Sequence, residues 1–184
     1  MSTVKFVHLC NWWRSGDELL LVIDLSLPIK PGVSCGGILI GDNIANYMSN
    51  LYQQFADVQV VEYKNTKHPV TSYIINKGVL RINTSEAGDI LSIGCSKGYK
   101  GLCKGIYGPG ITVEHLLKVS SQQNLLHGAI ILDRDFGFYF PIPYPHDELA
   151  DSIQDLPLQL RLDVLHVENV AWWINPQLTP AYAK

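Results

Sequence analysis

The sequence has few cysteines, few charged residues and no long hydrophobic run. Its four cysteines are too few for a disulfide scaffold of 184 residues, and none shows the CxxC spacing of a zinc ribbon. No apolar run approaches the ~20 residues of a membrane helix, and the N-terminal MSTVKFVHLCNWWRSGDE lacks the apolar core of a signal peptide. We therefore expect a soluble, cytoplasmic protein with buried, reduced thiols at these positions: Cys10, Cys35, Cys95 and Cys103.

The sequence also lacks the motifs that accompany catalysis. HExxH, GxSxG and the glycine-rich phosphate-binding patterns are absent, as are repeats and low-complexity segments. Of the six histidines, His8 and His166 fall in expected strands, where a core or edge position is the simpler interpretation. These absences favour a binding protein over an enzyme, with no cofactor and no metal.

The composition predicts one folded domain spanning residues 1–184, because 47% of the residues are hydrophobic and only 17% are charged. Helices are expected at 43–55 (capped by Asp42), 113–123 (capped by Thr112) and 146–156. Strands are expected at 4–10, 18–27 (a helix being the alternative), 38–40, 58–63, 70–76, 79–83, 89–95, 128–133, 136–141 and 158–167, with a further extension at 170–175.

Hairpins dominate this pattern. Tight turns at Lys77-Gly78 and Arg134-Asp135 each separate two expected strands, and helices are few. The sequence therefore predicts an α+β domain with a mostly antiparallel, twisted sheet. Strict alternation makes 158–167 the clearest strand, with one face formed by Leu158, Leu160, Leu162 and Val164.

The charges are distributed unevenly along the chain. Between residues 64 and 104 there are seven Lys or Arg and two acids, a balance of +5, whereas between 133 and 168 there are eight acids and two Arg, a balance of −6. Such a bipolar surface could steer a charged partner, although two blocks that face each other or simply solvate the surface would explain it equally well.

The segment CSKGYKGLCKGIYGPG, residues 95–110, is rich in glycine, lysine and tyrosine. It does not lead directly into a helix, as a phosphate-binding loop would, and the spacing of its cysteines and His115 is too wide for a zinc site. Two interpretations remain: a nucleic-acid contact that combines lysines with tyrosine stacking, or a glycine-rich loop that is either merely solvated or binds another protein. The overall acidity disfavours nucleic acid.

Residues 89–125 combine a strand (DILSIGC), a SKGYKG segment, a glycine-rich turn and a short helix (VEHLLKVSSQQN). This order resembles that of bacterial immunity proteins of contact-dependent growth inhibition systems, over about a fifth of the chain. The resemblance implies a small cytosolic α+β protein that binds the toxic C-terminal domain delivered by a neighbouring cell. The sequence differs from those proteins after the turn, where VEHLLKVSS stands in place of an acidic helix. No residue of this chain can be assigned as a toxin contact from the resemblance.

Three carboxylates offer an alternative, enzymatic interpretation. A small hydrolase or nucleic-acid-processing enzyme could use Asp24, Asp133 and Asp135 together with a histidine. Turn chemistry explains Asp133 and Asp135 more simply, whereas Asp24 is expected to be buried in a strand and paired with Arg81 or Arg161.

The leading hypothesis is a protein that neutralises a cognate toxin domain, with no nucleic acid or membrane as partner. Because toxin nucleases tend to be basic, the acidic block at 147–168, which ends at Glu168, is the natural contact. Addition of a toxin strand to a sheet edge near 79–104 is a rival mode. The candidate contact residues are Asp147, Glu148, Asp151, Asp155, Asp163, Lys97, Tyr99, Lys100, Lys104 and Tyr107.

Overall fold

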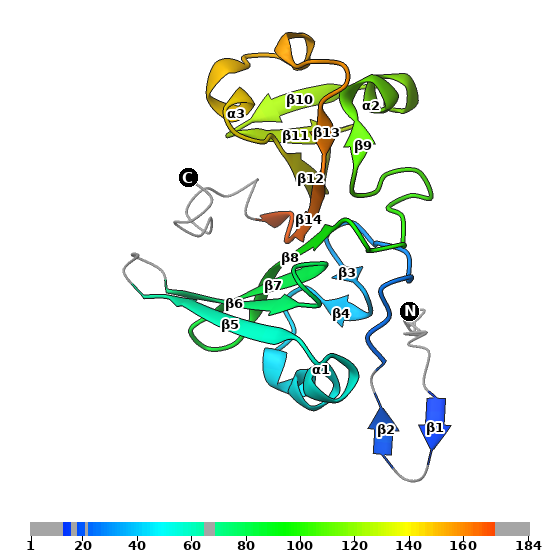
Figure 1. Cartoon of the computed structure of the whole chain (residues 1–184), viewed down its shortest axis with the longest axis vertical. Helices are drawn as coiled ribbons and strands as arrows, with labels where there is room; N and C mark the ends of the chain where they lie inside the picture. Colours follow the sequence, from blue (N-terminus) through cyan, green and yellow to red (C-terminus); the bar gives the residue numbers. More distant parts are fainter. Residues whose placement is uncertain (1–12, 16–17, 21, 65–68, 172–184) are drawn as a thin grey trace, which may run out of the picture.

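The computed structural model describes residues 13–15, 18–20, 22–64 and 69–171. Within these ranges one eight-stranded sheet has the spatial order β10-β11-β12-β14-β8-β7-β6-β5, and every neighbouring pair is antiparallel (Figure 1). The α+β class with a mostly antiparallel sheet is thus confirmed. The strands are β5 (Val58–Tyr63), β6 (Val70–Ile75), β7 (Leu80–Ser85), β8 (Ile90–Ser96), β10 (Gln123–Leu126), β11 (Ala129–Leu132), β12 (Asp135–Pro141) and β14 (Val164–Glu168).

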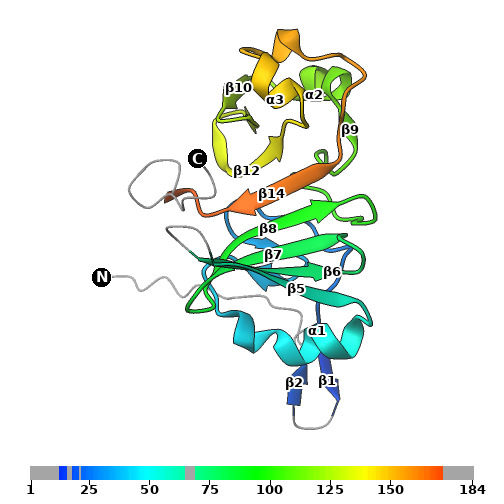
Figure 2. The ribbon, with the colours of Figure 1, turned by 60° about the vertical axis from the view of Figure 1, so that its left-hand side comes forward.

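Three further pairs of short strands lie outside this sheet. They are β1 (Trp13–Ser15) with β2 (Glu18–Leu20), β3 (Ser34–Cys35) with β4 (Ile38–Leu39), and β9 (Ile111–Thr112) with β13 (Arg161–Leu162). Figures 1 and 2 show α1 (Met48–Gln54) at the end of the molecule formed by β5–β8, and α2 (Val113–Val119) and α3 (His146–Leu149) at the end formed by β10–β12. None of the described helices has the length and apolarity that crossing a membrane requires.

Both predicted hairpins are present. Asn76, Lys77 and Gly78 have positive φ between β6 and β7, and Asp133 and Arg134 have φ of 51° and 58° between β11 and β12. Two consecutive residues with positive φ make the turn whose twist matches that of antiparallel strands. Asp133 is therefore a turn residue, as expected, but the turn lies at Asp133-Arg134 and not at Arg134-Asp135, and Asp135 is the first residue of β12.

One face of the sheet forms the core with α1 and the β3–β4 hairpin. Alternate residues of the central strands, including Ile93, Leu165 and Phe138, are fully buried and belong to the same apolar cluster as Ile38 and Leu51. β7 and β8 lie inside the sheet, and β5 and β10 form its edges. The prediction that a partner strand could be added near 79–104 is therefore wrong for β7 and β8, which already have a neighbour on each side.

The predicted helix at 43–55 is split. Asn43 rather than Asp42 caps a 3-10 turn at Ile44–Asn46, and α1 then covers residues 48–54. The Asp42 carboxylate instead accepts hydrogen bonds from the hydroxyl of Tyr47 and the amide of Asn46. Thr112 does cap α2, accepting from the backbone N–H of His115. The helix ends at residue 119, because Ser120 is extended and its hydroxyl donates to the carbonyl oxygen of Leu116.

The acidic helix predicted at 146–156 is also split. It consists of the four-residue α3 and a 3-10 turn at Ile153–Asp155, because Ser152 starts a new capping box there.

The continuous strand predicted at 158–167 is interrupted at Asp163, between β13 and β14. At this break the buried side chains change from an even-numbered residue, Leu162, to the odd-numbered Leu165 and Val167. Leu158 is exposed. The predicted apolar face through Leu158 and Val164 was therefore wrong.

The predicted buried strand at 18–27 is mostly loop. Only Glu18–Leu20 forms a strand, and residues 25–27 form a turn. Asp24 is half-buried and accepts hydrogen bonds from the backbone N–H and the hydroxyl of Ser26, so its expected pairing with Arg81 or Arg161 was wrong. The predicted strand at 4–10 lies outside the described residues, as does most of the extension at 170–175.

Candidate interaction surfaces

The loop of residues 97–110 is fixed to the core through its two tyrosines. The Tyr99 hydroxyl accepts a hydrogen bond from the backbone N–H of Gly36 (2.7 Å) and donates one to the carbonyl oxygen of Leu27 (2.8 Å). Backbone bonds add to this anchor, with Lys100 N–H donating to the carbonyl of Leu25 (2.8 Å). Burial raises the pKa of the Tyr99 hydroxyl, so it remains protonated and can donate.

Tyr107 anchors the other end of the loop. Its ring lies 5.6 Å from that of Phe138, and its hydroxyl is 3.3 Å from the carbonyl oxygen of Val119 and 3.2 Å from a carboxylate oxygen of Asp133. Tyr99 and Tyr107 are both buried. The expectation that their rings supply a partner contact, whether protein or stacked base, is corrected, because their surface is used inside the fold.

The three described cysteines are free and buried, as expected. The pKa of Cys95 is strongly raised, first by its hydrogen bond with the Cys35 thiol and then by burial, and burial raises the pKa of Cys103 to about 12. Thiols with raised pKa values are poor nucleophiles and poor metal ligands. Among the described residues, no group of three or more His, Cys, Asp or Glu side chains could hold a metal ion.

The carboxylates of the alternative hydrolase interpretation have separate sets of partners. Asp133 accepts from the backbone N–H groups of Ser121 and Gln122 and from the Ser121 hydroxyl, which is the main cause of its lowered pKa. Asp135 forms an ion pair with Lys104 (2.7 Å), and Asp24 binds only the neighbouring Ser26 among the described residues. Each carboxylate is thus accounted for by its local partners.

The three loop lysines have different surroundings. Lys104 is paired with Asp135 and its ammonium lies 5.3 Å from the centre of the Phe138 ring, so its charge is largely compensated. Lys97 and Lys100 are exposed and form no ion pair with another residue of the described ranges. Of the three loop lysines, Lys97 and Lys100 therefore have charges that no described carboxylate compensates.

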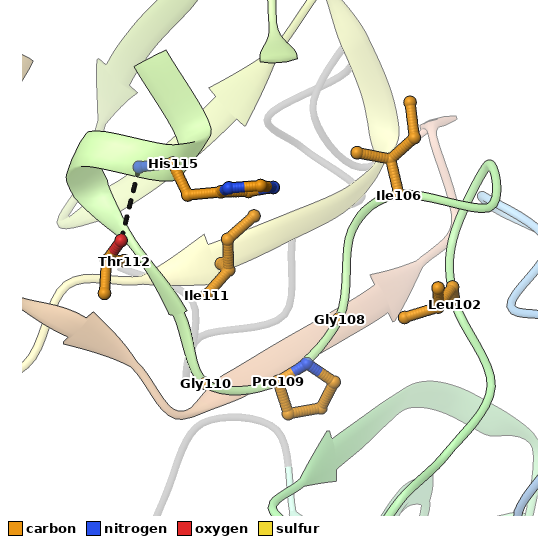
Figure 3. Close-up of a pocket in the computed structure, with 8 residues that line it drawn as sticks. All are labelled: Leu102, Ile106, Gly108, Pro109, Gly110, Ile111, Thr112 and His115. Atoms are coloured by element: carbon orange, nitrogen blue, oxygen red, sulfur yellow. Dashed lines mark hydrogen bonds between the residues drawn. The ribbon is translucent and has the colours of Figure 1, made fainter. Parts of the chain in front are cut away.

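A shallow groove with both apolar and polar walls opens where this loop meets α2 (Figure 3). It has a volume of about 410 Å³, and its walls include Leu102, Ile106, Pro109, Ile111 and His115. Leu102 and Ile106 are large apolar side chains with 42% and 47% of their surface exposed. A Cβ at Gly108 would lie 2.8 Å from Cδ2 of Leu102. Only glycine at this position therefore gives the Leu102 side chain enough space.

A cationic hollow of about 510 Å³ adjoins the groove. It is lined by Ser96, Lys97, Arg161 and Asp163, and Nη2 of Arg161 lies 3.1 Å from the position that a Cβ would take at Gly110 in the groove. Oδ1 of Asp163 lies 3.8 Å from Nε of Arg161, and both side chains are about two-thirds exposed. The sequence pointed to Lys97 and Asp163 as contact residues and to Arg161 only as a possible partner of Asp24. Leu102 and Ile106 were missed, because lone apolar residues in a glycine-rich loop follow no period.

A second candidate surface surrounds α3. Asp147, Glu148 and Asp151 are exposed, and none of them forms an ion pair with a described residue. Asp155 is exposed too, but its carboxylate accepts from the backbone and hydroxyl of Ser152, which lowers its pKa and makes it mainly a capping residue. Figures 1 and 2 place α3 beside β10 and β11, away from the loop that follows β8, so the predicted contact residues form two surfaces.

Two exposed apolar residues lie among these acids. Tyr144 is 77% exposed and Leu149 is 73% exposed, the two highest values among the large apolar side chains of the described residues. We name Tyr144, Asp147, Glu148, Leu149 and Asp151 the acidic surface. The sequence analysis missed Tyr144 and Leu149, although an aromatic residue between two prolines (PYPHDE) was a visible signal.

Glu168, counted with the acidic block from the sequence, is not a surface residue. It is only 2% exposed, and its carboxyl oxygen accepts a hydrogen bond from the hydroxyl of Tyr139 (2.9 Å). Burial raises its pKa to about 7. The acidic balance at the surface is therefore smaller than the sequence suggests.

His166 occupies the same face of β14, as its predicted strand position implied. Its ring stacks on that of Tyr139, with ring centres 5.2 Å apart, and lies close to Gly94 on the neighbouring strand. Its Nδ1 is buried and has no hydrogen-bond partner among the described residues. Burial, with a smaller contribution from the charge of Arg81, lowers the His166 pKa to about 4, so the ring is neutral near pH 7.

Comparison of the chain with protein-family models, with curated proteins and with solved structures finds no match. Its two surfaces must therefore be interpreted from their own chemistry.

Proposed function

We propose that the protein acts by binding another protein, and specifically that it neutralises a basic toxin domain in the cytoplasm, as the resemblance of residues 89–125 implies. The observation that carries this proposal is the exposure of Tyr144 and Leu149 among carboxylates without ion-pair partners in the described chain. Large apolar side chains surrounded by charge are typical of binding hot spots. The carboxylates supply the charge complementarity that speeds association with a basic partner.

The mechanism requires no bond-making chemistry from this chain. A toxin nuclease grips phosphate groups with a basic surface, and an acidic protein that covers this surface blocks the substrate path. In this mechanism Tyr144 and Leu149 supply the apolar contact, whereas Asp147, Glu148 and Asp151 steer the encounter.

The proposal predicts that a gene adjacent to this one encodes a secreted protein with a toxic C-terminal domain, and that domain is the probe. The purified chain should inhibit it at an equimolar ratio. Tyr144→Ala and Leu149→Ala should each weaken binding at least about 30-fold, the effect of losing a hot-spot side chain. Isothermal titration calorimetry measures the affinity, and the toxin's own activity assay measures inhibition.

Tyr52→Ala and Leu158→Ala are matched controls, since these side chains are 54% exposed and lie outside the acidic surface. They should bind the toxin domain like the wild type. Equal affinities for all four variants, or no inhibition by the wild type, would contradict the proposal.

A further inference from the structure

The groove and the cationic hollow together form a surface whose exposed charge is positive, opposite to that of the acidic surface. Leu102 and Ile106 stay exposed although the loop that carries them is fastened by buried Tyr99 and Tyr107 on either side. A loop with fixed ends holds its apolar residues in place, so an occupant would meet a surface that is largely formed in advance.

The charge beside the groove limits the choice of occupant. Lys97 and Arg161 line the adjoining hollow, and Arg161 reaches Gly110 in the groove itself. The single carboxylate there, Asp163, lies 3.8 Å from Arg161 with both side chains largely in solvent, a contact worth little and readily exchanged for another carboxylate. Arg is suited to binding a carboxylate through two parallel hydrogen bonds.

We infer that this groove is a second protein-binding site, which takes an extended segment carrying an aliphatic side chain next to an aspartate or glutamate. The aliphatic side chain packs against Leu102, Ile106 and Pro109, and the carboxylate binds Arg161 and Lys97. Because the acidic surface is proposed to meet a basic partner, the two sites select segments of opposite charge, and the chain can join two different proteins.

NMR titration of the full, ¹⁵N-labelled chain tests this inference without the toxin domain. The probe is a peptide with acetylated and amidated ends, Gly-Ser-Leu-Asp-Leu-Glu-Gly-Ser, so that its only carboxylates are side chains. It should shift the amide signals of Gly108, Gly110, Ile111 and Thr112 and the Nε–H signal of Arg161. A peptide with both acids replaced by lysine should bind at least about tenfold more weakly.

Two variants locate the contacts. Ile106→Asp should abolish binding of the acidic peptide, and Arg161→Glu should weaken it about tenfold, while Lys77→Glu, the same kind of charge change on an exposed hairpin, should leave it unaltered. The wild-type titration decides the matter even if a variant fails to fold.

The inference is overturned if the acidic peptide leaves the groove amides unshifted, if the lysine peptide binds equally well, or if Arg161→Glu binds like the wild type. It is also overturned if only peptides with a free C-terminal carboxylate bind, or if dilution of the chain alone causes the same shifts, which would indicate a second copy in the groove. None of these outcomes affects toxin inhibition by the acidic surface, so the two proposals fail separately.

Discussion

Replacement of Gly101 by alanine should destabilise the protein by more than about 3 kcal/mol. A Cβ at this position would overlap the carbonyl oxygen of Leu27 and lie 2.7 Å from both the carbonyl carbon of Leu27 and Cε1 of Tyr99. These neighbours are backbone and a buried ring, which cannot move without breaking the hydrogen bond between Tyr99 and Leu27. The free energy of unfolding, measured with urea, is the relevant quantity.

Gly105→Ala is the matched control for this prediction. Gly105 lies in the same loop and has a φ of +72°, but a Cβ there would meet nothing within 4 Å. Its cost is the local strain of a left-handed conformation, about 1–2 kcal/mol. Similar losses for the two variants would show that the loop is not packed against residues 24–29 as described.

The second large effect is a pair of opposite pH dependences at the Tyr139–His166–Glu168 cluster. Glu168→Gln should make the protein lose about 3 kcal/mol relative to the wild type as the pH falls from 7 to 4.5. His166→Phe should make it lose about 3 kcal/mol relative to the wild type as the pH rises from 4 to 6.5. These figures follow from folded-state pKa values of about 7 for Glu168 and about 4 for His166.

The signs follow from which state holds the proton more tightly. Glu168 has a raised pKa, so its stabilising contribution is complete below pH 4.5 and is lost as the pH rises through 7. His166 has a lowered pKa, so its contribution is complete above pH 6.5 and is lost as the pH falls through 4. Between pH 4.5 and 6.5 the two contributions change in opposite directions and largely cancel in the wild type. Each substitution removes one contribution, so the pH dependence of the other can be measured.

Urea unfolding at pH 4, 4.5, 5.5, 6.5 and 7 measures this effect as the difference between each variant and the wild type. Subtraction removes the titration of other carboxylates, such as Asp133 and Asp155, whose pKa values are lowered by hydrogen bonds. Glutamine keeps an acceptor for the Tyr139 hydroxyl, and phenylalanine keeps a ring beside it. If both variants parallel the wild type, these side chains are not buried as described.

The hairpins and the short central strands could be predicted from the sequence because their signals are local. Glycine and aspartate at the turns and the β-branched and aromatic residues of 70–85 and 128–141 predict these elements without knowledge of the rest of the chain. The same applies to Thr112, whose side chain caps the helix that directly follows it.

The errors arose where tertiary contacts outweigh local pattern. The alternating leucines of 158–167 predicted one strand, but Asp163 separates β13, which pairs with β9, from β14, which pairs with β8 and β12. Tyr99 and Tyr107 looked like surface residues because lysine and glycine surround them, yet their hydroxyls bind carbonyls contributed by distant segments. Exposure of Leu149 likewise depends on what packs nearby, whereas the two prolines that flank Tyr144 were a local signal that could have been used.

The central claim is that the acidic surface binds a toxin domain. Amide hydrogen–deuterium exchange of the full chain, with and without the toxin domain encoded by the adjacent gene, tests it most directly. Residues 143–156 contain only short helical turns and should exchange rapidly in the free chain. The account predicts that the toxin domain slows exchange there and leaves β5 and α1 unaltered. Unchanged exchange at 143–156, with slowing elsewhere or nowhere, would contradict it.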